Sequence, residues 1–460
     1  MEGPIFDMVN LLGTTFCDPD TPGFDKVVDR SSDAKIIHAT APTVNDLTYA
    51  LQKMALLQES DLTSLSKSGL TIAFNDTAEY RKCVLYSSKS DLVDTLDKIT
   101  PPMARIPSKP PKLCCIVTCQ GTHYPTMGRQ VYRASTVFRH HFDFCAALVK
   151  SEYAIDIKAF LLEEVDENVV PDWMKSPVNF LPYLLALQFA LFKLWESWGI
   201  KPDYVLGLSF GEYGAAAMAG MITIEESFRL VMTRVRLMTD HIQEQAFCVG
   251  MMDQKRFEEI VAEARKDEGM EDIWFKIVAR NSPKQTCVLS EAKYTEKLIE
   301  TCKKHGIKTI TYPYHPYHSS LTLPIIPEFS KTTSAINYQP AKCKYISTVT
   351  GKMWEKLDKQ YFLDHLTGTA EFILAVETAV GEGITHFMEI GPHPIHIQMA
   401  KDILSSNDPL ASGKYSFYTS LKKKVGDRVA LLNNLGRLYS AGYEVDWEEV
   451  EKFQSQDLAI

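Results

Sequence analysis

The sequence lacks the features that mark several specialised classes of protein. It has 10 cysteines, but they form no CxxC pair and no regular framework, which argues against a disulfide scaffold and against structural zinc. Basic residues are also fewer than acidic residues. The formal net charge of -9 argues against nucleic acid as the main partner. The start, Met1-Glu-Gly-Pro, has no basic segment followed by an apolar core, so we expect no signal peptide and a cytoplasmic protein with reduced thiols.

An uninterrupted apolar run of membrane-spanning length is missing too. The most apolar stretch, residues 180–198, contains Pro182, Gln188, Lys193 and Glu196, and it is therefore predicted to be a buried helix. Internal repeats and low-complexity tracts are absent. With 460 residues of ordinary globular composition, the chain should form two or three domains or subdomains.

Alternating patterns divide the chain into regions. Residues 46–96 contain helical and strand-like segments, and five prolines within 100–111 predict a boundary or a stiff connector. Strands and helices then alternate to about residue 240 and again up to about 405, as in a parallel sheet covered by helices. Between them, 245–313 has short strands and charged helices in β-α-β-β-α-β order, which predicts a ferredoxin-like insert.

The most informative short motif is G-x-S-x-G at Gly207, Ser209 and Gly211. An apolar strand-like stretch precedes it and a helix rich in small residues follows it. A strand, a sharp turn and a helix lift a serine oxygen above the sheet edge, and the helix N-terminus directs N–H groups at negative charge beside it. The alternative is an ordinary turn with a bystander serine, so the motif alone leaves the choice open.

A nucleophilic serine needs a base, and two of the 12 histidines stand out. His315 and His318 flank a Pro-Tyr pair in a loop that follows a predicted strand. A lone histidine is more often a surface residue or a satisfied core residue, so these two become candidates only together with other segments.

Seven segments in the correct order resemble the acyltransferase domain of modular polyketide synthases and the related malonyl-CoA:acyl-carrier-protein transacylases. They cover the oxyanion loop, the elbow, the arginine helix, an Asn-Ser-Pro turn, the histidine loop, a Ser-Thr-Val-Thr-Gly turn and a Gly-Pro-His-Pro loop. These are Cys119-Gln-Gly121, Gly207-Leu-Ser-Phe-Gly-Glu212, Arg234-Val-Arg-Leu-Met238, Asn281-Ser-Pro283, His315-Pro-Tyr-His-Ser319, Ser347–Gly351 and Glu389-Ile-Gly-Pro-His-Pro394.

The resemblance covers roughly residues 46–447 and implies an α/β fold. The core would be a hydrolase-like parallel sheet formed by 112–244 and 314–410. A ferredoxin-like small subdomain would occupy 245–313. An α/β domain resembling the linker between ketosynthase and acyltransferase would occupy 1–111, and the segment after the acyltransferase, 411–460, would pack back on it.

The resemblance also implies residue roles. Ser209 would be the nucleophile and His318 the general base, because a serine hydroxyl is weakly nucleophilic until an imidazole takes its proton. Family members orient this histidine with a backbone carbonyl, which we expect from the loop around 391–394. The N–H groups of Gln120 and Phe210 would form the oxyanion hole.

Substrate selection is expected at a second set of residues. Arg234 follows Ser209 by 25 residues, as in the family, and would bind the carboxylate of a malonyl group; otherwise it is a solvent-facing arginine on a helix. Tyr317 would fill the space of a 2-methyl group, with some leakage to methylmalonyl. His315, Asn281 and Leu208 complete the predicted substrate-binding set.

Four positions depart from the family pattern. Leu208 replaces the histidine before the serine, Cys119 replaces the first glycine of Gly-Gln-Gly, and His123 stands where a second glutamine is usual. Leu181 stands where the family has a glutamine near the pocket. None of these changes removes the serine, the histidine or the arginine, so we expect them to affect the polarity of the pocket and the substrate preference more than the acyl-transfer chemistry.

The implied reaction transfers malonyl from malonyl-CoA through a seryl ester to the phosphopantetheine thiol of an acyl carrier protein, in polyketide or fatty-acid synthesis. No metal and no bound cofactor is expected, and neither a membrane nor nucleic acid is expected as partner. Carrier proteins of this kind are acidic. Lys422-Lys-Lys424 with Arg428 is therefore a candidate docking patch, although a lysine run is more often a solvated turn.

Three other functions are alternatives to acyl transfer. An editing acyl hydrolase on the same scaffold would be expected to lack Arg234, a non-catalytic docking module of a synthase would not need all the site residues, and an esterase would need an acidic triad member. The sequence leaves open whether the chain is a stand-alone, trans-acting enzyme or a piece of a longer synthase, with other synthase domains as partners.

Overall fold

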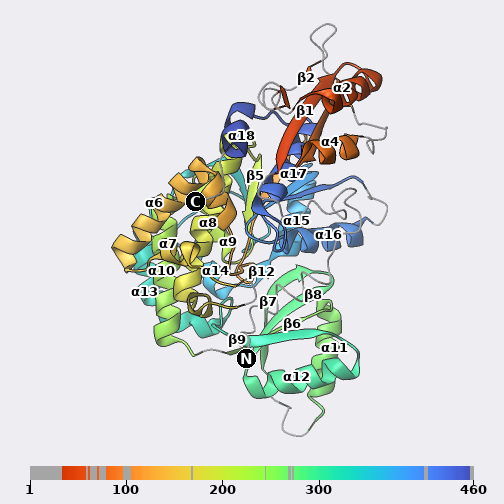
Figure 1. Ribbon diagram of the computed structural model, residues 1–460. Coiled ribbons are helices and arrows are strands. Elements are labelled where there is room, and N and C mark those ends of the chain that lie inside the picture. The colour runs from red at the N-terminus through yellow and green to blue at the C-terminus, as the bar shows by residue number, and fades with distance from the viewer. Residues whose placement is uncertain are drawn as a thin grey trace.

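The computed structural model describes residues 34–58, 61–62, 70–71, 79–96, 105–166, 169–243, 245–267, 271, 274–408 and 413–455. Residues 1–33 and the prolines at 101 and 102 lie outside this set. Figure 1 shows three bodies along the long axis of the molecule: an N-terminal unit in red at the top, a large sheet with its helices in the middle, and a small green and teal unit at the bottom.

The middle body is built on a six-stranded sheet in the order β11-β10-β5-β4-β13-β14. Neighbouring strands run parallel except at the edge, where β11 is antiparallel to β10. The strands are β4 (Leu113–Val117), β5 (Tyr204–Gly207), β10 (Pro340–Ile346), β11 (Met353–Lys356), β13 (His386–Ile390) and β14 (Ser416–Thr419).

Helices cover both faces of this sheet, and strand β4 shows why its sequence is continuously apolar. Cys115 and Val117 belong to the core shared with helices α6 to α10, whereas Cys114 and Ile116 belong to the core shared with α15 and α16. A strand buried on both faces needs no alternation of polar and apolar residues.

The helices of this body are α5 (Arg129–Ala134), α6 (Thr136–Tyr153), α7 (Ile157–Leu162), α8 (Pro177–Ser197), α9 (Gly211–Met218), α10 (Ile224–His241), α13 (Ile326–Ser334), α14 (Tyr361–Thr367), α15 (Phe372–Gly381) and α16 (His396–Asn407), with short 3-10 helices η1 (Asp172–Lys175) and η2 (Ser320–Ile325).

Helix α8 is long and apolar enough to cross a membrane, but 78% of its most apolar window is buried inside the protein. It packs against α6, α9 and α10. The prediction of a buried helix at this position therefore agrees with the structure.

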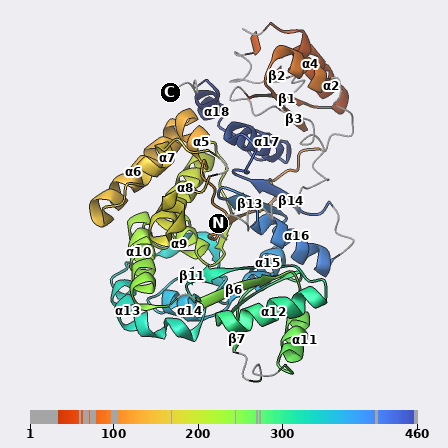
Figure 2. The ribbon, with the colours of Figure 1, turned by 60° about the horizontal axis from the view of Figure 1, so that its bottom comes forward.

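The small body carries the predicted ferredoxin-like arrangement. Its antiparallel strands lie in the order β7-β8-β6-β9, and a short strand of the large body, β12 (Ala370–Glu371), extends the sheet beside β7. Figure 2 shows α11 and α12 on one side of this sheet. Its elements are β6 (Gln245–Gly250), α11 (Gln254–Ala264), β7 (Phe275–Ser282), β8 (Gln285–Ser290), α12 (Ala292–Lys304) and β9 (Thr309–Tyr314). The α/β fold class predicted from the sequence is confirmed.

The N-terminal unit is joined to the end of the chain. Its three-stranded sheet has the order β2-β1-β3, and α17 (Asp427–Ser440) packs on β1 and β3. Trp447, which begins α18 (Trp447–Gln454), stacks on His38 with ring centroids 3.8 Å apart. Gly436 permits the close approach of α17, since a Cβ there would lie 2.8 Å from the Cβ of Cys83. The remaining elements are β1 (Lys35–Ala41), α2 (Val44–Leu56), β2 (Leu70–Thr71), β3 (Tyr80–Tyr86) and α4 (Lys89–Leu96). The domain boundaries themselves stay a prediction.

Candidate active site

Ser209 lies in a strained turn between strand β5 and helix α9. Its φ angle is 52°, in the left-handed region that non-glycine residues seldom adopt. Only glycine fits on either side. A Cβ on Gly207 would lie 2.3 Å from the carbonyl carbon of Gly211, and a Cβ on Gly211 would lie 2.2 Å from the carbonyl oxygen of Val117. The spacing of the G-x-S-x-G motif is therefore required by the crossing of strand and helix.

A buried carboxylate fixes this turn to a neighbouring loop. Glu212 accepts a hydrogen bond from the backbone N–H of Thr348 at 2.6 Å and one from the hydroxyl of Tyr361 at 2.6 Å. The Thr348 hydroxyl lies 2.8 Å from the carbonyl oxygen of Gly207. Burial raises the pKa of Glu212 to about 7, although the hydrogen bonds from Thr348 and Tyr361 act to lower it. The Ser347–Gly351 turn thus anchors the elbow, which the sequence did not reveal.

The predicted base is in place. The Oγ atom of Ser209 lies 2.6 Å from Nε2 of His318, and Nδ1 of His318 lies 2.9 Å from the carbonyl oxygen of Gly368. A carbonyl oxygen only accepts, so Nδ1 carries the proton and the Nε2 lone pair faces the serine hydroxyl. Like Ser209, His318 has a positive φ angle, 63°.

The source of the orienting carbonyl differs from the prediction. It comes from Gly368, at the end of helix α14, and not from the loop around 391–394. That loop follows β13, whereas α14 ends beside the histidine loop, where its Leu366 carbonyl also accepts the N–H of His318 at 2.8 Å. The prediction was wrong because no local pattern marks Gly368 as a partner of His318.

The environment of His318 keeps its imidazole neutral. Burial, followed by the positive charge of Arg234, lowers the pKa of His318 to about 4. At neutral pH the Nε2 atom is therefore free to accept the serine proton, as a general base must.

A second histidine, His365 of helix α14, borders this pair. Its Nε2 atom lies 2.9 Å from the carbonyl oxygen of Ser209, and its ring centroid lies 5.1 Å from that of His318. Burial lowers the pKa of His365 well below its usual value, and the positive charge of Arg234 acts in the same direction. Sequence reasoning missed this residue, because it is a single histidine on a helix outside any of the motifs.

The predicted oxyanion donors flank the serine. Phe210 follows Ser209 at the N-terminal end of α9, and Gln120 follows strand β4. Within the described ranges, neither backbone N–H donates a hydrogen bond to another protein group. Both donors are thus available to an oxygen formed beside Ser209.

Arg234 is buried rather than solvent-facing, with 1% of its surface exposed. Its Cζ atom lies 4.5 Å from the ring centroid of Tyr317, 4.7 Å from that of Tyr213 and 5.9 Å from that of Phe210. Aromatic faces stabilise a guanidinium held in this way. His315 lies nearby, with its ring edge toward Tyr317 and Nε2 3.5 Å from the hydroxyl of Thr239.

A cavity beside Ser209 lies between the large and small bodies. The large body contributes Leu208, Tyr317 and His318, among others, and the small body contributes Asn281 and Cys287. Asn281 donates to Gln285 Oε1 at 2.9 Å and to Cys287 Sγ at 3.1 Å, so its amide is held in the cavity wall. Arg234 does not line this cavity; it contacts Tyr317, which does.

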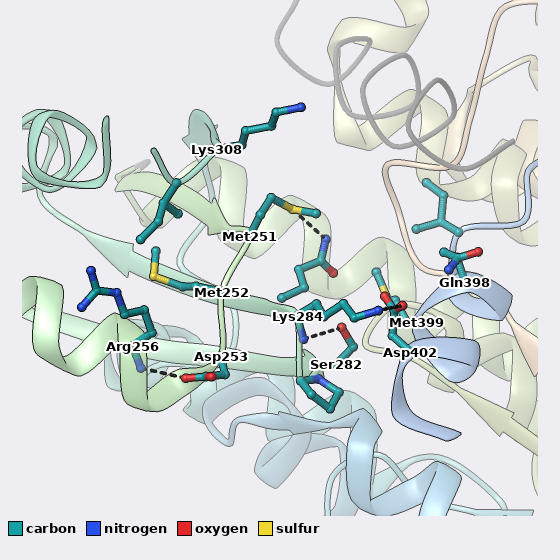
Figure 3. A pocket seen from close by; sticks show the side chains of 14 residues that line it. Met251, Met252, Asp253, Arg256, Ser282, Lys284, Lys308, Gln398, Met399 and Asp402 are labelled. Atoms are coloured by element: carbon teal, nitrogen blue, oxygen red, sulfur yellow. Dashed lines mark hydrogen bonds and ion pairs between the residues drawn. The ribbon is translucent and has the colours of Figure 1, made fainter. Parts of the chain in front are cut away.

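A larger cavity of about 680 Å³ adjoins the first and shares Gln285, Ile395 and Met399 with it. Figure 3 shows its wall, in which Lys284 is paired with Asp402 at 2.9 Å and Arg256 and Lys308 lie on the small-body side. The two adjoining cavities therefore lead from Ser209 to a partly cationic wall that contains Arg256, Lys284 and Lys308.

Three of the remaining sequence positions are also placed by the structure. His123 stacks on Phe180 with ring centroids 4.3 Å apart, and burial lowers the pKa of His123 to about 4. Leu181 is fully buried in the core. Arg428, proposed as part of a docking patch, is buried against Phe453 and donates to the carbonyls of Phe453 and Gln454. That part of the prediction was wrong, because a side chain used in packing α17 on α18 cannot face a partner.

Comparison with known proteins agrees with this geometry. Residues 115–445 match the sequence pattern of the family described as "Acyl transferase domain". The non-reducing polyketide synthase PKS19 of Phaeosphaeria nodorum is 28% identical over 440 residues, which cover 93% of this chain and 24% of that protein. The chain thus spans about a quarter of the length of this relative.

Solved structures show the same fold. The acyl transferase domain of ZmaA superposes with a TM-score of 0.78 at 21% identity, covering 91% of this chain and 97% of that chain. The acyl transferase domain of SpnD, in complex with 2-(pent-4-yn-1-yl)malonyl, superposes with a TM-score of 0.74 at 24% identity, covering 90% and 97%. The match over residues 115–445 shows that the chain belongs to the acyl transferase domain family.

Proposed function

We propose that this acyltransferase moves a malonyl group from malonyl-CoA to the phosphopantetheine thiol of an acyl carrier protein, through an ester on Ser209. The observation that carries the proposal is the Ser209–His318 contact of 2.6 Å, with the histidine oriented by the Gly368 carbonyl. A serine paired with a neutral, oriented imidazole beside free N–H donors is an arrangement for acyl transfer.

The first transfer forms the ester. Ser209 Oγ attacks the thioester carbonyl and its proton passes to Nε2 of His318, while the N–H groups of Gln120 and Phe210 stabilise the negative oxygen. The carbon–sulfur bond then breaks, and CoA leaves as a thiol with the proton from His318. In the second transfer, the carrier thiol gives its proton to His318 and attacks the ester, and Ser209 recovers the proton.

The malonyl preference rests on Arg234 and Tyr317. Arg234 is a buried cation whose charge already acts on the pKa of His318, so a carboxylate on the acyl group would meet a positive charge close to the reacting serine. Tyr317 lies against both Arg234 and the cavity, where its ring would crowd a substituent on the second malonyl carbon.

The larger cavity, whose wall is partly cationic, supports CoA as the acyl donor. A phosphopantetheine arm reaching Ser209 through the first cavity would leave the nucleotide phosphates near Lys284, Arg256 and Lys308. The relatives' greater length also favours a carrier protein and other synthase domains as partners. No metal or bound cofactor is needed for either transfer, and the cytoplasmic location stays a prediction.

Intact mass after incubation with malonyl-CoA tests the proposal. The protein should gain one malonyl group, the Ser209→Ala variant should gain none, and addition of a carrier protein bearing phosphopantetheine should move the group to that thiol. Release of free malonate instead of carrier loading would support the editing hydrolase. Equal labelling of the Ser209→Ala variant would exclude Ser209 as the acyl site.

A further inference from the structure

The carbonyl that orients His318 belongs to a segment shared by the large and small bodies. Gly368 follows helix α14, and after Thr369 the residues Ala370 and Glu371 form β12, the short strand that extends the sheet of the small body. Figure 1 shows β12 beside β7, where the middle and small bodies meet. The predicted base is therefore oriented by a carbonyl that nearly adjoins the small body's sheet.

Two side chains hold this segment against β7. The hydroxyl of Thr369 donates a hydrogen bond to the carbonyl oxygen of Ile277 at 2.9 Å. Arg280 forms an ion pair with the carboxylate of Glu371, and its Nε atom donates to Oε1 of Gln254 at 2.7 Å, which fixes the guanidinium. Both partners of the ion pair are partly buried, so salt screens them less than it screens a surface pair. These contacts reinforce the pairing of β12 with β7.

The same segment is joined to the serine elbow. The backbone N–H of Glu371 donates to the carbonyl oxygen of Thr348 at 2.6 Å. Thr348 in turn donates to Glu212 and to the carbonyl oxygen of Gly207, on the strand before the elbow. Residues 368–371 thus contact the base, the loop that anchors the elbow and the small body. A displacement of β12 would therefore disturb the base where it faces the elbow.

Strand β7 also forms part of the wall of the acyl cavity. Val278, Ala279 and Asn281 of this strand line the cavity beside Ser209. Two irregularities interrupt the pairing of β7 with β8 over the same stretch. Bulges of this kind re-aim side chains and are frequent next to active sites. The strand that would contact an acyl thioester is therefore also the strand that holds the orienting carbonyl in place.

We propose that Thr369 and Arg280 are positioning residues for the reaction at Ser209. By holding β12 on β7, they keep the Gly368 carbonyl at Nδ1 of His318, with Nε2 facing the serine hydroxyl. They act through the imidazole, because a displaced carbonyl lets the ring rotate or take the other tautomer, in which Nε2 carries the proton and cannot accept one. The inference rests on the proposed pairing of serine and histidine, but not on which acyl group is transferred.

The test measures the reactivity of Ser209 with an alkyl fluorophosphonate, which carries neither a carboxylate nor CoA. Oγ of the serine forms a bond to phosphorus, the phosphorus–fluorine bond breaks, fluoride leaves and the serine proton passes to His318. Intact mass over time gives the labelling rate at saturating probe, kinact, and the half-saturating probe concentration, KI. Wild-type protein should be labelled once, and the Ser209→Ala variant should not be labelled.

Matched substitutions at Thr369 separate positioning from packing. Thr369→Val replaces the hydroxyl with a methyl group of similar size and removes the hydrogen bond to Ile277, whereas Thr369→Ser keeps a hydroxyl. Misplacement by about 1 Å can cost about a hundredfold in rate, so a partial loosening in Thr369→Val should lower kinact by about threefold to tenfold and leave KI unchanged. Thr369→Ser should keep the wild-type kinact.

Arg280 tests the same contact from the small body. Arg280→Gln removes the charge and should also lower kinact, whereas Arg280→Lys, which can still pair with Glu371, should recover most of the rate. Lys297→Gln is the control, because it removes an ion pair with Asp267, at 2.6 Å, that lies within the small body. It should leave kinact unchanged. Circular dichroism and thermal melting show whether each variant is folded.

A positioning role also predicts dependence on the base. In the His318→Ala background, Thr369→Val should have no further effect on the remaining labelling rate, since the two changes act through one imidazole. A further fall in that background would make the contact structural and overturn the inference. Equal kinact in wild type, Thr369→Val and Arg280→Gln would overturn the inference alone. If wild-type Ser209 does not react, the proposed function and the inference both fail.

Discussion

Nε2 of His365 donates a hydrogen bond to the carbonyl oxygen of Ser209 over 2.9 Å, so the backbone of the predicted nucleophile is fixed by a side chain from helix α14. The direction follows from the carbonyl, which only accepts. Nδ1 of the same ring lies 3.3 Å from the hydroxyl of Tyr213, which can donate to it. His365 thus connects the strained elbow to α9 and contacts His318 edge-on.

His365 is therefore predicted to position Ser209. The His365→Phe variant keeps a ring but removes one of two hydrogen bonds to the Ser209 carbonyl, which still accepts from the backbone N–H of Glu212 at 3.0 Å, so the loss is about 0.5–1.5 kcal/mol. We expect kcat for malonyl transfer to fall by about twofold to tenfold with little change in KM, and the His365→Gln variant, whose amide can replace the N–H, to recover most of the rate. Steady-state kinetics with thermal melting would separate this from simple unfolding. A folded His365→Phe variant with wild-type kcat would contradict the role.

The two histidines of the loop should differ in their effect on rate. His318 contacts Ser209 directly, whereas His315 contacts Thr239 and the ring of Tyr317. His318→Ala should lower the acylation rate by about a hundredfold or more, which is the range for a general base. His315→Ala should mainly alter the preference among acyl groups. Single-turnover loading of both variants tests this ranking, and the reverse order would assign the base to His315.

Removal of the buried cation should change the charge preference. The Arg234→Met variant keeps a long apolar side chain between Tyr213 and Tyr317 but removes the charge. A hydrogen bond to a charged group contributes about 1.5–3 kcal/mol, so the malonyl-to-acetyl ratio of kcat/KM should fall by about tenfold to a hundredfold. Competition between the two acyl-CoA donors gives this ratio directly. An unchanged ratio would make Arg234 structural, and the natural acyl group would need no carboxylate.

Tyr317 should set the size limit of the acyl group. Its ring lies 4.5 Å from Arg234 and lines the cavity, so Tyr317→Ser opens space beside the bound carboxylate. Methylmalonyl transfer should rise relative to malonyl transfer, by no more than about a hundredfold, because one methyl group changes selectivity only to that extent. Tyr317→Phe, which retains the ring, is the matched control and should keep the wild-type ratio. Equal ratios in all three proteins would place the size filter elsewhere.

The pH dependence of acylation should reflect the buried imidazole. Burial and then Arg234 lower the pKa of His318 to about 4, so its neutral, proton-accepting form persists well below the pKa of about 6.5 of a free histidine. The single-turnover loading rate should stay level from neutral pH to about pH 5 and fall only as the pH drops through about 4. Circular dichroism at each pH checks that the chain is folded. A midpoint near 6.5 would mean that His318 is solvated in the working enzyme.

The sequence by itself determined the order of strands and helices and the strand–turn–helix that carries Ser209. The Gly207–Gly211 spacing fixes a local crossing of strand and helix, and the alternation of strands and helices fixes the parallel sheet with its small insert. The Ser209–His318 pairing was also predicted, although its residues are 109 apart, because each lies in a recognisable segment. Such features depend on neighbours in sequence or on motifs that can be compared one by one.

The tertiary structure alone decided which unmarked residues meet at the site. Strand β4 lies between β5 and β13, with Val117 paired to Gly207 on one side and to Ile390 on the other. Because parallel strands end at the same edge of the sheet, the segments after them converge there. That convergence places Cys119 beside His396, whereas the end of α14 places Gly368 and His365 against His318 and Ser209. Strand order and helix docking are set by the summed packing of the whole core, which no local pattern in the sequence records.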